Sequence, residues 1–148
     1  MLIKIPLEKI DMQGDGYHLA LQALVNQVEV RLILDTGASR TVFDVNRIDR
    51  FMQEAQLVPN EKLSTGLGTN EMQSDIISIE SFELGLLHIK DYATVAIDLG
   101  HINQSYEMLQ MPLIDGVLGG DLLEEFKAKI DYQRQELSLN FYKKDFPF

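Results

Sequence analysis

Residues 30–39 place a carboxylate where it could take part in catalysis. The apolar run Val-Arg-Leu-Ile-Leu ends at Asp35, and Thr36, Gly37 and two small residues follow. A strand that ends at Asp35 would leave this side chain at a loop, and Gly37 would let another part of the backbone approach closely. General acid–base chemistry needs a carboxylate held in this way. From these residues alone, a strand that ends in an ordinary Asp-containing turn remains an alternative.

A second motif, far downstream, narrows this interpretation. It is Asp115-Gly116-Val117-Leu118-Gly119. Together with Asp35-Thr36-Gly37-Ala38-Ser39, it resembles the aspartic proteases of the pepsin and retroviral type, over residues from about 17 to 141. The resemblance implies that Asp35 is the catalytic carboxylate, that Thr36 braces the loop of a partner and that Gly37 lies beside the catalytic water. It also implies that the second motif supports this loop by packing beside it.

The chain has one Asp-Thr-Gly sequence, whereas aspartic proteases work with two carboxylates that share one proton. Like charges a few ångströms apart cannot both ionise cheaply, so one pKa rises; the aspartic-protease pair is the established example of this effect. Retroviral enzymes are homodimers, so the resemblance implies a homodimer that brings two copies of Asp35 together. The retroviral pattern has an Arg after the last glycine of the second motif. Gly120 and Asp121 stand there instead, which leaves the dimer contact open.

The resemblance also implies a flap, which is a glycine-containing hairpin that closes over a peptide substrate. Residues 63–75 are the best candidate because they contain Gly66-Leu67-Gly68-Thr69, although an ordinary surface turn explains this composition equally well. Ala38 and Ser39 are expected to lie against the substrate. Many pepsin-like members have a hydroxyl at the position of Ala38, and its hydrogen bond lowers the pKa of the carboxylate. We therefore expect a working pH nearer neutral than that of pepsin.

Strand-like segments would position both motifs. Residues 17–25 and 28–34 alternate around Asn26-Gln27, which predicts a hairpin that ends at Asp35. Further strands are predicted at residues 3–7, 73–84, 87–99, 117–118, 127–132 and 135–141.

Two helices are also expected. The first would run from Asp44 to residue 56, because Val45, Ile48 and Met52 recur at helical spacing. The second would run to Phe126 with Asp121 as its cap and Glu124 completing a capping box. Residues 102–110 form either a short helix or an irregular loop. The pattern predicts a mainly β, closed or semi-closed retropepsin-like acid-protease fold with two short helices, as one domain over residues 1–148.

Composition argues against several other classes of protein. The net charge of -10, with only 13 Lys and Arg, argues against nucleic-acid binding. No apolar stretch approaches the roughly 20 residues that cross a membrane. The chain has no Cys, and His18, His88 and His101 match no metal-binding spacing, so we expect no metal and no other cofactor. The first residues do not match a signal peptide, so a cytoplasmic location is expected.

Three functions remain in view. The first is an aspartic endopeptidase that binds an extended peptide between two copies of the chain. The second is a catalytically silent module of the same fold, used for dimerisation or peptide binding; the intact Asp35-Thr36-Gly37 argues against it and the missing Arg leaves it open. The third is an actin-like ATPase, whose phosphate-binding turn also carries Asp-x-Gly-x-Ser/Thr after a strand. This chain is too short for two nucleotide-binding lobes.

Overall fold

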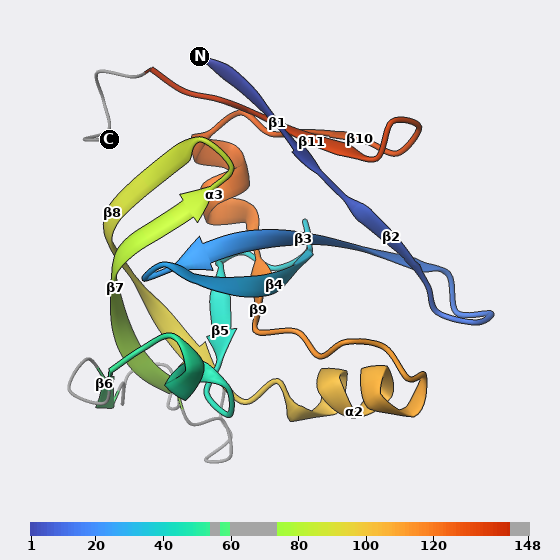
Figure 1. Ribbon diagram of the computed structural model, residues 1–148, viewed down its shortest axis with the longest axis horizontal. Helices are drawn as coiled ribbons and strands as arrows, with labels where there is room; N and C mark the ends of the chain where they lie inside the picture. The colour runs from blue at the N-terminus through green and yellow to red at the C-terminus, as the bar shows by residue number, and fades with distance from the viewer. Residues whose placement is uncertain (54–56, 60–73, 143–148) are drawn as a thin grey trace.

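A computed structural model describes residues 1–53, 57–59 and 74–142 (Figure 1). In chain order its strands are β1 (Leu2–Pro6), β2 (Glu8–Asp11), β3 (Tyr17–Val25), β4 (Val28–Leu34), β5 (Val42–Asp44), β6 (Leu57–Pro59), β7 (Ser74–Leu84), β8 (Leu87–Ile97), β9 (Gly116–Leu118), β10 (Lys129–Asp131) and β11 (Glu136–Asn140). Its helices are the single 3-10 turn η1 (Ile48–Arg50), α2 (Gly100–Met108) and α3 (Gly120–Glu125).

Six strands close into a barrel in the order β3-β4-β9-β5-β8-β7, and the pairing of β3 with β7 completes the ring. β2 and β6 extend the same sheet beyond the ring. β9 is buried at all three positions and lies parallel to β4, so the end of β4 meets the end of β9. The prediction of a mainly β, closed fold with two short helices is therefore confirmed.

The β3–β4 hairpin matches the predicted residues. Its turn consists of Asn26 and Gln27, which both have positive φ, as a two-residue turn between twisted strands requires. Val25 pairs with Val28 beside the turn, and this register continues to Ala20 and Ile33. The turn therefore determines which residue of β3 lies level with the loop after β4.

The interior contains two apolar clusters. The larger fills the barrel and includes Phe43 and Phe82, whose rings meet edge to face at 5.8 Å. The smaller consists of Ile10, Ala20, Ile33, Leu99, Tyr106, Ile114 and Val117, with Ile102 packed against it. It joins α2 to the strands beside Asp35, so α2 packs against the part of the barrel that carries the first motif.

A separate three-stranded sheet has the order β1-β11-β10 (Figure 1). Its strands correspond to the predicted segments 3–7, 127–132 and 135–141. Pro6 lies in β1, an edge strand, where a residue without an N–H group is tolerated. The chain ends of the described part meet here, because the Met1 ammonium donates to the Phe141 carbonyl at 2.6 Å.

The predicted helix from Asp44 to residue 56 is wrong over its described part. Asp44 belongs to β5, and only Ile48–Arg50 form a helical turn. The physical reason is the Asp44 carboxylate, which is buried and accepts bonds from the backbone of Asn46 and Leu99 and from the side chain of Asn103. The bonds to Leu99 and Asn103 tie Asp44 to the region of α2, while the bond to Asn46 forms only a local turn, so the chain after β5 makes the single turn η1 and not a continuous helix. Residues 102–110, for which a helix and a loop were both left open, fall mostly within α2, so in the described residues α2 and α3 are the two α-helices.

The second predicted helix, which was expected to run to Phe126, is present as α3, but its predicted cap is also wrong. α3 begins after Gly119, and no side chain caps it. Asp121 lies inside the helix, and its carboxylate accepts bonds from Thr41 rather than from the first turn of α3. No helix in the described residues is long and apolar enough to span a membrane.

Candidate active site around Asp35

The Asp35 loop is held in place by its own backbone and by the end of β9. The Asp35 N–H donates to the Leu118 carbonyl at 3.0 Å, and the Ala38 N–H donates to the Asp35 carbonyl at 3.2 Å. The Gly37 N–H donates to Asp35 Oδ1 at 2.9 Å, while the carboxylate itself is exposed. A Cβ on Gly37 would lie 3.2 Å from this Oδ1, so the glycine allows the close approach. The first motif thus presents an oriented, solvent-accessible carboxylate.

The second motif packs directly beneath this loop, as predicted. A Cβ on Gly119 would lie 2.5 Å from the carbonyl carbon and oxygen of Arg40, and a Cβ on Gly116 would lie 2.5 Å from the Val42 carbonyl oxygen. The Gly120 N–H donates to the Ala38 carbonyl at 2.7 Å. Two backbones meet here without room for side chains, which explains glycine at these positions.

A polar cluster below the contact ties the loop to the helix and to β8. Thr41 is fully buried; its N–H and Oγ1 both donate to Asp121 Oδ1 at 2.8 Å, and Oγ1 accepts from the Gly119 N–H at 2.9 Å. The Tyr92 hydroxyl donates to Asp121 Oδ2 at 2.5 Å, and the Thr94 hydroxyl donates to the Thr41 carbonyl. Burial, followed by the bond to Asp121, raises the pKa of Tyr92. We call Thr41, Tyr92, Gly119 and Asp121 the loop base.

Asp115, the first residue of the second motif, anchors β9 from its other end. Its buried carboxylate accepts from Arg47 Nε at 2.8 Å, from the Arg50 guanidinium at 2.5 Å and from the Arg31 N–H at 2.9 Å. A buried carboxylate needs such partners, since leaving it unpaired would be costly. Its supporting role was predicted from the motif, whereas its arginine partners were not.

Asp35 opens onto a cleft of about 320 Å³. Among the described residues, those that line it are Tyr17, His18, Leu19, Ile33, Leu34, Asp35, Thr36, Ile102, Val117, Ile130 and Tyr132. Asp35 is the only acid among them, and apolar and aromatic side chains make up most of the rest. One carboxylate above an apolar floor can take or give a single proton, but it cannot by itself form the two-carboxylate pair described above.

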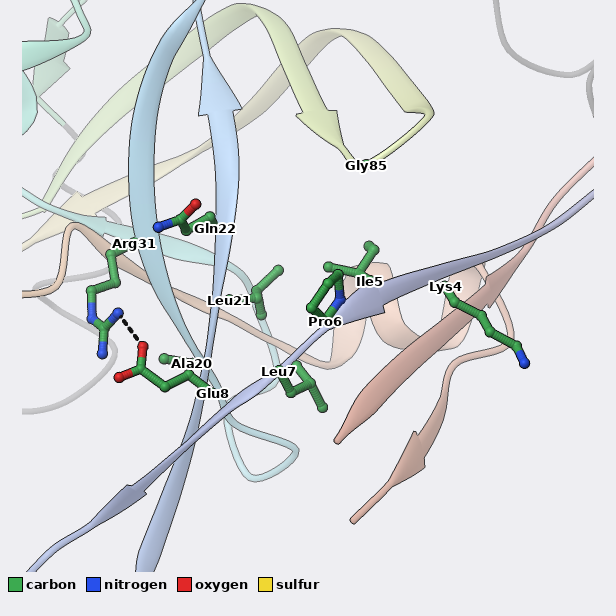
Figure 2. Close-up of a pocket in the computed structure, with 10 residues that line it drawn as sticks. All are labelled: Lys4, Ile5, Pro6, Leu7, Glu8, Ala20, Leu21, Gln22, Arg31 and Gly85. Atoms are coloured by element: carbon green, nitrogen blue, oxygen red, sulfur yellow. Dashed lines mark hydrogen bonds and ion pairs between the residues drawn. The ribbon is translucent and has the colours of Figure 1, made fainter. Parts of the chain in front are cut away.

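A larger cavity, of about 410 Å³, lies elsewhere, between the link from β1 to β2 and the β7–β8 turn (Figure 2). Its lining includes Gly85, Lys4 and the ion pair between Arg31 and Glu8, whose charged atoms are 2.6 Å apart. The bond to Arg31 lowers the pKa of Glu8. Asp35 does not line this cavity. The charged side chains in its lining are already paired, Arg31 with Glu8 and Lys4 with Glu136. The cleft beside Asp35 is therefore the better candidate site.

The structure brings together only part of the predicted site. Asp35, Thr36 and Val117 line the cleft, Gly37 and Gly119 shape the loop, and Leu118 accepts the Asp35 N–H. Ala38 and Ser39 continue the loop, but neither lines the cleft. The proposed flap residues, Gly66, Leu67, Gly68 and Thr69, lie outside the described residues. No cluster of three or more His, Cys, Asp or Glu in the described part of the chain could hold a metal ion.

Sequence reasoning gave no site role to His18, Ile102 or Tyr132, which line the cleft. For His18 a signal existed. Continuing the β3–β4 register two residues beyond the pair Ala20–Ile33 brings His18 level with Asp35. Ile102 and Tyr132 reach the cleft through the packing of α2 and of the β10–β11 hairpin, which no local pattern indicates.

Comparisons with known proteins agree with this geometry. A family model described as "Aspartyl protease" matches residues 21–122. No protein in the curated set matches the chain. Among solved structures, a retropepsin-like aspartic protease from Rickettsia conorii is 24% identical, with a TM-score of 0.58 over 95% of this chain and 90% of that one.

Two more distant structures have the same fold. The retroviral protease-like domain of Ddi1 from Leishmania major is 18% identical, with a TM-score of 0.54 over 86% of this chain and 96% of that one. The EIAV protease in complex with the inhibitor HBY-793 is also 18% identical, with a TM-score of 0.54 over 82% of this chain and 99% of that one. The family match covers both motifs and the barrel strands between them.

Proposed function

The chain belongs to the aspartyl protease family, and we propose that it is an aspartic endopeptidase whose site combines Asp35 from two copies of the chain. The observation that carries this proposal is the single carboxylate on a braced loop above an apolar cleft. A lone carboxylate can act as a base or as an acid, but peptide hydrolysis needs both at once. A second copy, related by a two-fold axis, supplies the missing group.

In the proposed reaction the two carboxyl groups share one proton. The ionised Asp35 takes a proton from water while the water oxygen attacks the peptide carbonyl carbon, and the protonated Asp35 of the other copy donates its proton to the carbonyl oxygen. In the tetrahedral intermediate, the proton held by the first carboxyl passes to the peptide nitrogen and the C–N bond breaks. One hydroxyl proton returns to the second carboxylate, which restores the starting state. No metal or other cofactor enters these steps.

The surface beside Asp35 suits contact with a second copy. Thr36 and Ile130 line the cleft and also a neighbouring hollow of about 300 Å³. Gly120, Leu123 and Ala128 line this hollow as well. The charges in this hollow are Glu124 and Lys127, whose charged atoms are 3.9 Å apart. A face that is apolar and locally neutral lets two chains of net charge -10 approach without strong repulsion.

The test is cleavage of a complex peptide library between pH 4 and 8, read by mass spectrometry, at high protein concentration. Wild type is compared with Asp35→Asn, and Asp15→Asn serves as a matched control because Asp15 is exposed in the β2–β3 turn. We expect cuts that wild type and the control make and Asp35→Asn does not. Ala38 has no hydroxyl that could hydrogen-bond the catalytic carboxylate. We therefore expect most activity above pH 4.

Sedimentation of the same samples measures the oligomeric state. Activity that rises with dimer content supports a site shared between copies. A dimer without any Asp35-dependent cut would contradict the endopeptidase proposal and favour the catalytically silent module.

A further inference from the structure

Asp35 faces a wall built from α2 and the beginning of β3. His18 and Ile102 line the cleft together with Asp35, and extending the hairpin register two residues beyond its last pair, Ala20–Ile33, sets His18 level with Asp35. Tyr106, also on α2, stands behind them in the smaller apolar cluster. We call His18, Ile102 and Tyr106 the α2 wall. It contains the only histidine among the described residues that line the cleft.

Tyr106 holds the His18 ring in one orientation. Its hydroxyl lies 2.7 Å from His18 Nδ1, and the two rings are 5.8 Å apart at an angle of 36°. Tyr106 is 0% exposed, and burial raises its pKa to about 12, so the hydroxyl keeps its proton. Arg31 and Glu8 act on the pKa of this hydroxyl in opposite directions, and they form an ion pair with each other.

This hydrogen bond determines which proton His18 offers. Which atom donates depends on the tautomer of the neutral ring. The buried hydroxyl has no other hydrogen-bond partner within the described part of the chain, so we infer that it uses its proton by donating to Nδ1 of His18. When the hydroxyl donates to Nδ1 of the neutral ring, the ring proton must sit on Nε2. When the ring is protonated, Nδ1 donates to the hydroxyl oxygen and Nε2 still carries a proton. His18 therefore presents an N–H donor on the side away from Tyr106 in both states.

Beside His18, the α2 wall and the cleft residues next to it are apolar. Ile102 faces the cleft with Ile33 and Val117, and no acid other than Asp35 lines it within the described residues. An extended peptide places alternate side chains on the same side. Two side chains of one substrate can therefore contact the α2 wall together, one at His18 and the other at Ile102.

We propose, resting on the endopeptidase function above, that the α2 wall is a specificity-determining element. Ile102 receives an apolar side chain, and His18, positioned by Tyr106, donates a hydrogen bond to a carboxylate or carboxamide side chain of the peptide. His18 and Tyr106 are specificity and positioning residues, and neither is placed at the reacting atoms. Because two copies face each other, the same preference recurs on both sides of the cut bond.

The first experiment uses the cleavage library with wild type, His18→Leu and Tyr106→Phe. His88→Leu is the matched control, because His88 bonds Ser81 between β7 and β8 and does not line the cleft. We expect wild-type cuts to be enriched for Asp, Glu, Asn or Gln at one subsite. In matched peptides that differ only by Gln or Leu there, His18→Leu should lower the Gln/Leu ratio of kcat/KM about fivefold to tenfold, as loss of one hydrogen bond predicts.

Tyr106→Phe should lower the same ratio less, since the ring loses only its support, and His88→Leu should leave it unchanged. If the His18–Tyr106 bond were purely structural, its loss would lower stability without changing this ratio. Thermal unfolding is therefore measured in parallel. Asp35-dependent cuts without the enrichment, or an unchanged ratio in His18→Leu, would overturn the inference and leave the endopeptidase function intact.

A binding arm separates the two proposals when no cut is seen. Asp35→Asn protein, with and without His18→Leu, captures peptides from the same library without cleaving them. Retention of Gln- or Glu-containing peptides that His18→Leu loses would support the α2 wall as a recognition element even if the protein is catalytically silent. No retention and no cleavage would overturn both proposals.

Discussion

The loop base and the α2 wall lie on two sides of the same carboxylate but are built differently. In the loop base two backbones meet where no side chain fits, and the buried polar atoms of Thr41 are paired with the half-buried Asp121 carboxylate. In the α2 wall the contacts are between side chains, namely the His18–Tyr106 bond and the packing of Ile102 and Tyr106 in the smaller apolar cluster. Beside the wall, the Asn103 side chain ties α2 to Asp44. Backbone packing tolerates little change, whereas side-chain packing can be rebuilt residue by residue.

This difference suggests a division of roles. The loop base determines where the Asp35 carboxylate lies, so changes there should affect stability and every substrate alike. The α2 wall determines what lies beside Asp35, so changes there should affect substrates unequally. The variants below test that division, beginning with the largest expected effect.

Gly119→Ala should damage the loop base most. The new Cβ would lie 2.5 Å from backbone atoms of Arg40, which cannot move aside as a side-chain end can. We expect a loss of about 3 kcal/mol or more in the free energy of unfolding, at or above the upper range for overpacking. Urea denaturation measures it. Gly120→Ala is the matched control, because its Cβ would lie 3.3 Å from the Ala38 carbonyl oxygen; an equal loss in both variants would contradict this explanation.

Asp121→Ala should weaken the loop base by removing its shared acceptor. The buried N–H and hydroxyl of Thr41 and the hydroxyl of Tyr92 would lose their partner, which predicts a loss of about 2–3 kcal/mol. Because the loop above would lose its support, kcat/KM should fall for all peptides by a similar factor. Asp121→Asn retains one acceptor oxygen, so its free energy of unfolding should lie between those of wild type and Asp121→Ala. A selective loss, confined to some peptides, would break the proposed division.

The two regions also differ in what could be predicted from the sequence. The Asp35 loop, the hairpin before it and the second motif were predicted with their residues, because short motifs and two-residue turns are local signals. Asp44 and Asp121 were both assigned as helix caps from their sequence neighbours. Asp44 also bonds Asn103, and Asp121 bonds Thr41; both of these partners lie far away in the chain, and no local pattern contains that information.

The α2 wall shows a different limit. Residues 102–110 carry only a weak helical signal, and α2 is stabilised by packing against Ile33 and Val117 rather than by its own pattern. His18 was within reach of sequence reasoning, since the predicted turn at Asn26-Gln27 fixes the register that brings it level with Asp35. Its partner Tyr106 was not, because the position of α2 is a tertiary property.

Asp44→Ala should affect the α2 wall in the way that Asp121→Ala affects the loop base. It leaves the Leu99 N–H and the Asn103 side chain without their buried acceptor, so we expect a loss of about 2 kcal/mol. If α2 shifts while Asp35 stays in place, selectivity among library peptides should change more than the cleavage of the best peptide. A uniform fall in kcat/KM, as expected for Asp121→Ala, would show that the two regions are not independent. Asp49→Ala, at an exposed position of η1, is the control.

Each region contains a tyrosine with a raised pKa, and alkaline unfolding compares them. A hydroxyl whose pKa is higher in the folded state than its unfolded value of about 10 stays protonated in the fold while the unfolded chain ionises, so stability falls as pH rises above 10. For Tyr106, with a pKa of about 12, this loss should reach about 1 kcal/mol by pH 11. Tyr106→Phe and Tyr92→Phe should each flatten the fall in urea midpoint between pH 9 and 11, whereas Tyr132→Phe, at a residue 61% exposed, should not. Flattening by Tyr92→Phe alone would mean that water reaches Tyr106, and the wall that positions His18 would then be more open than its packing indicates.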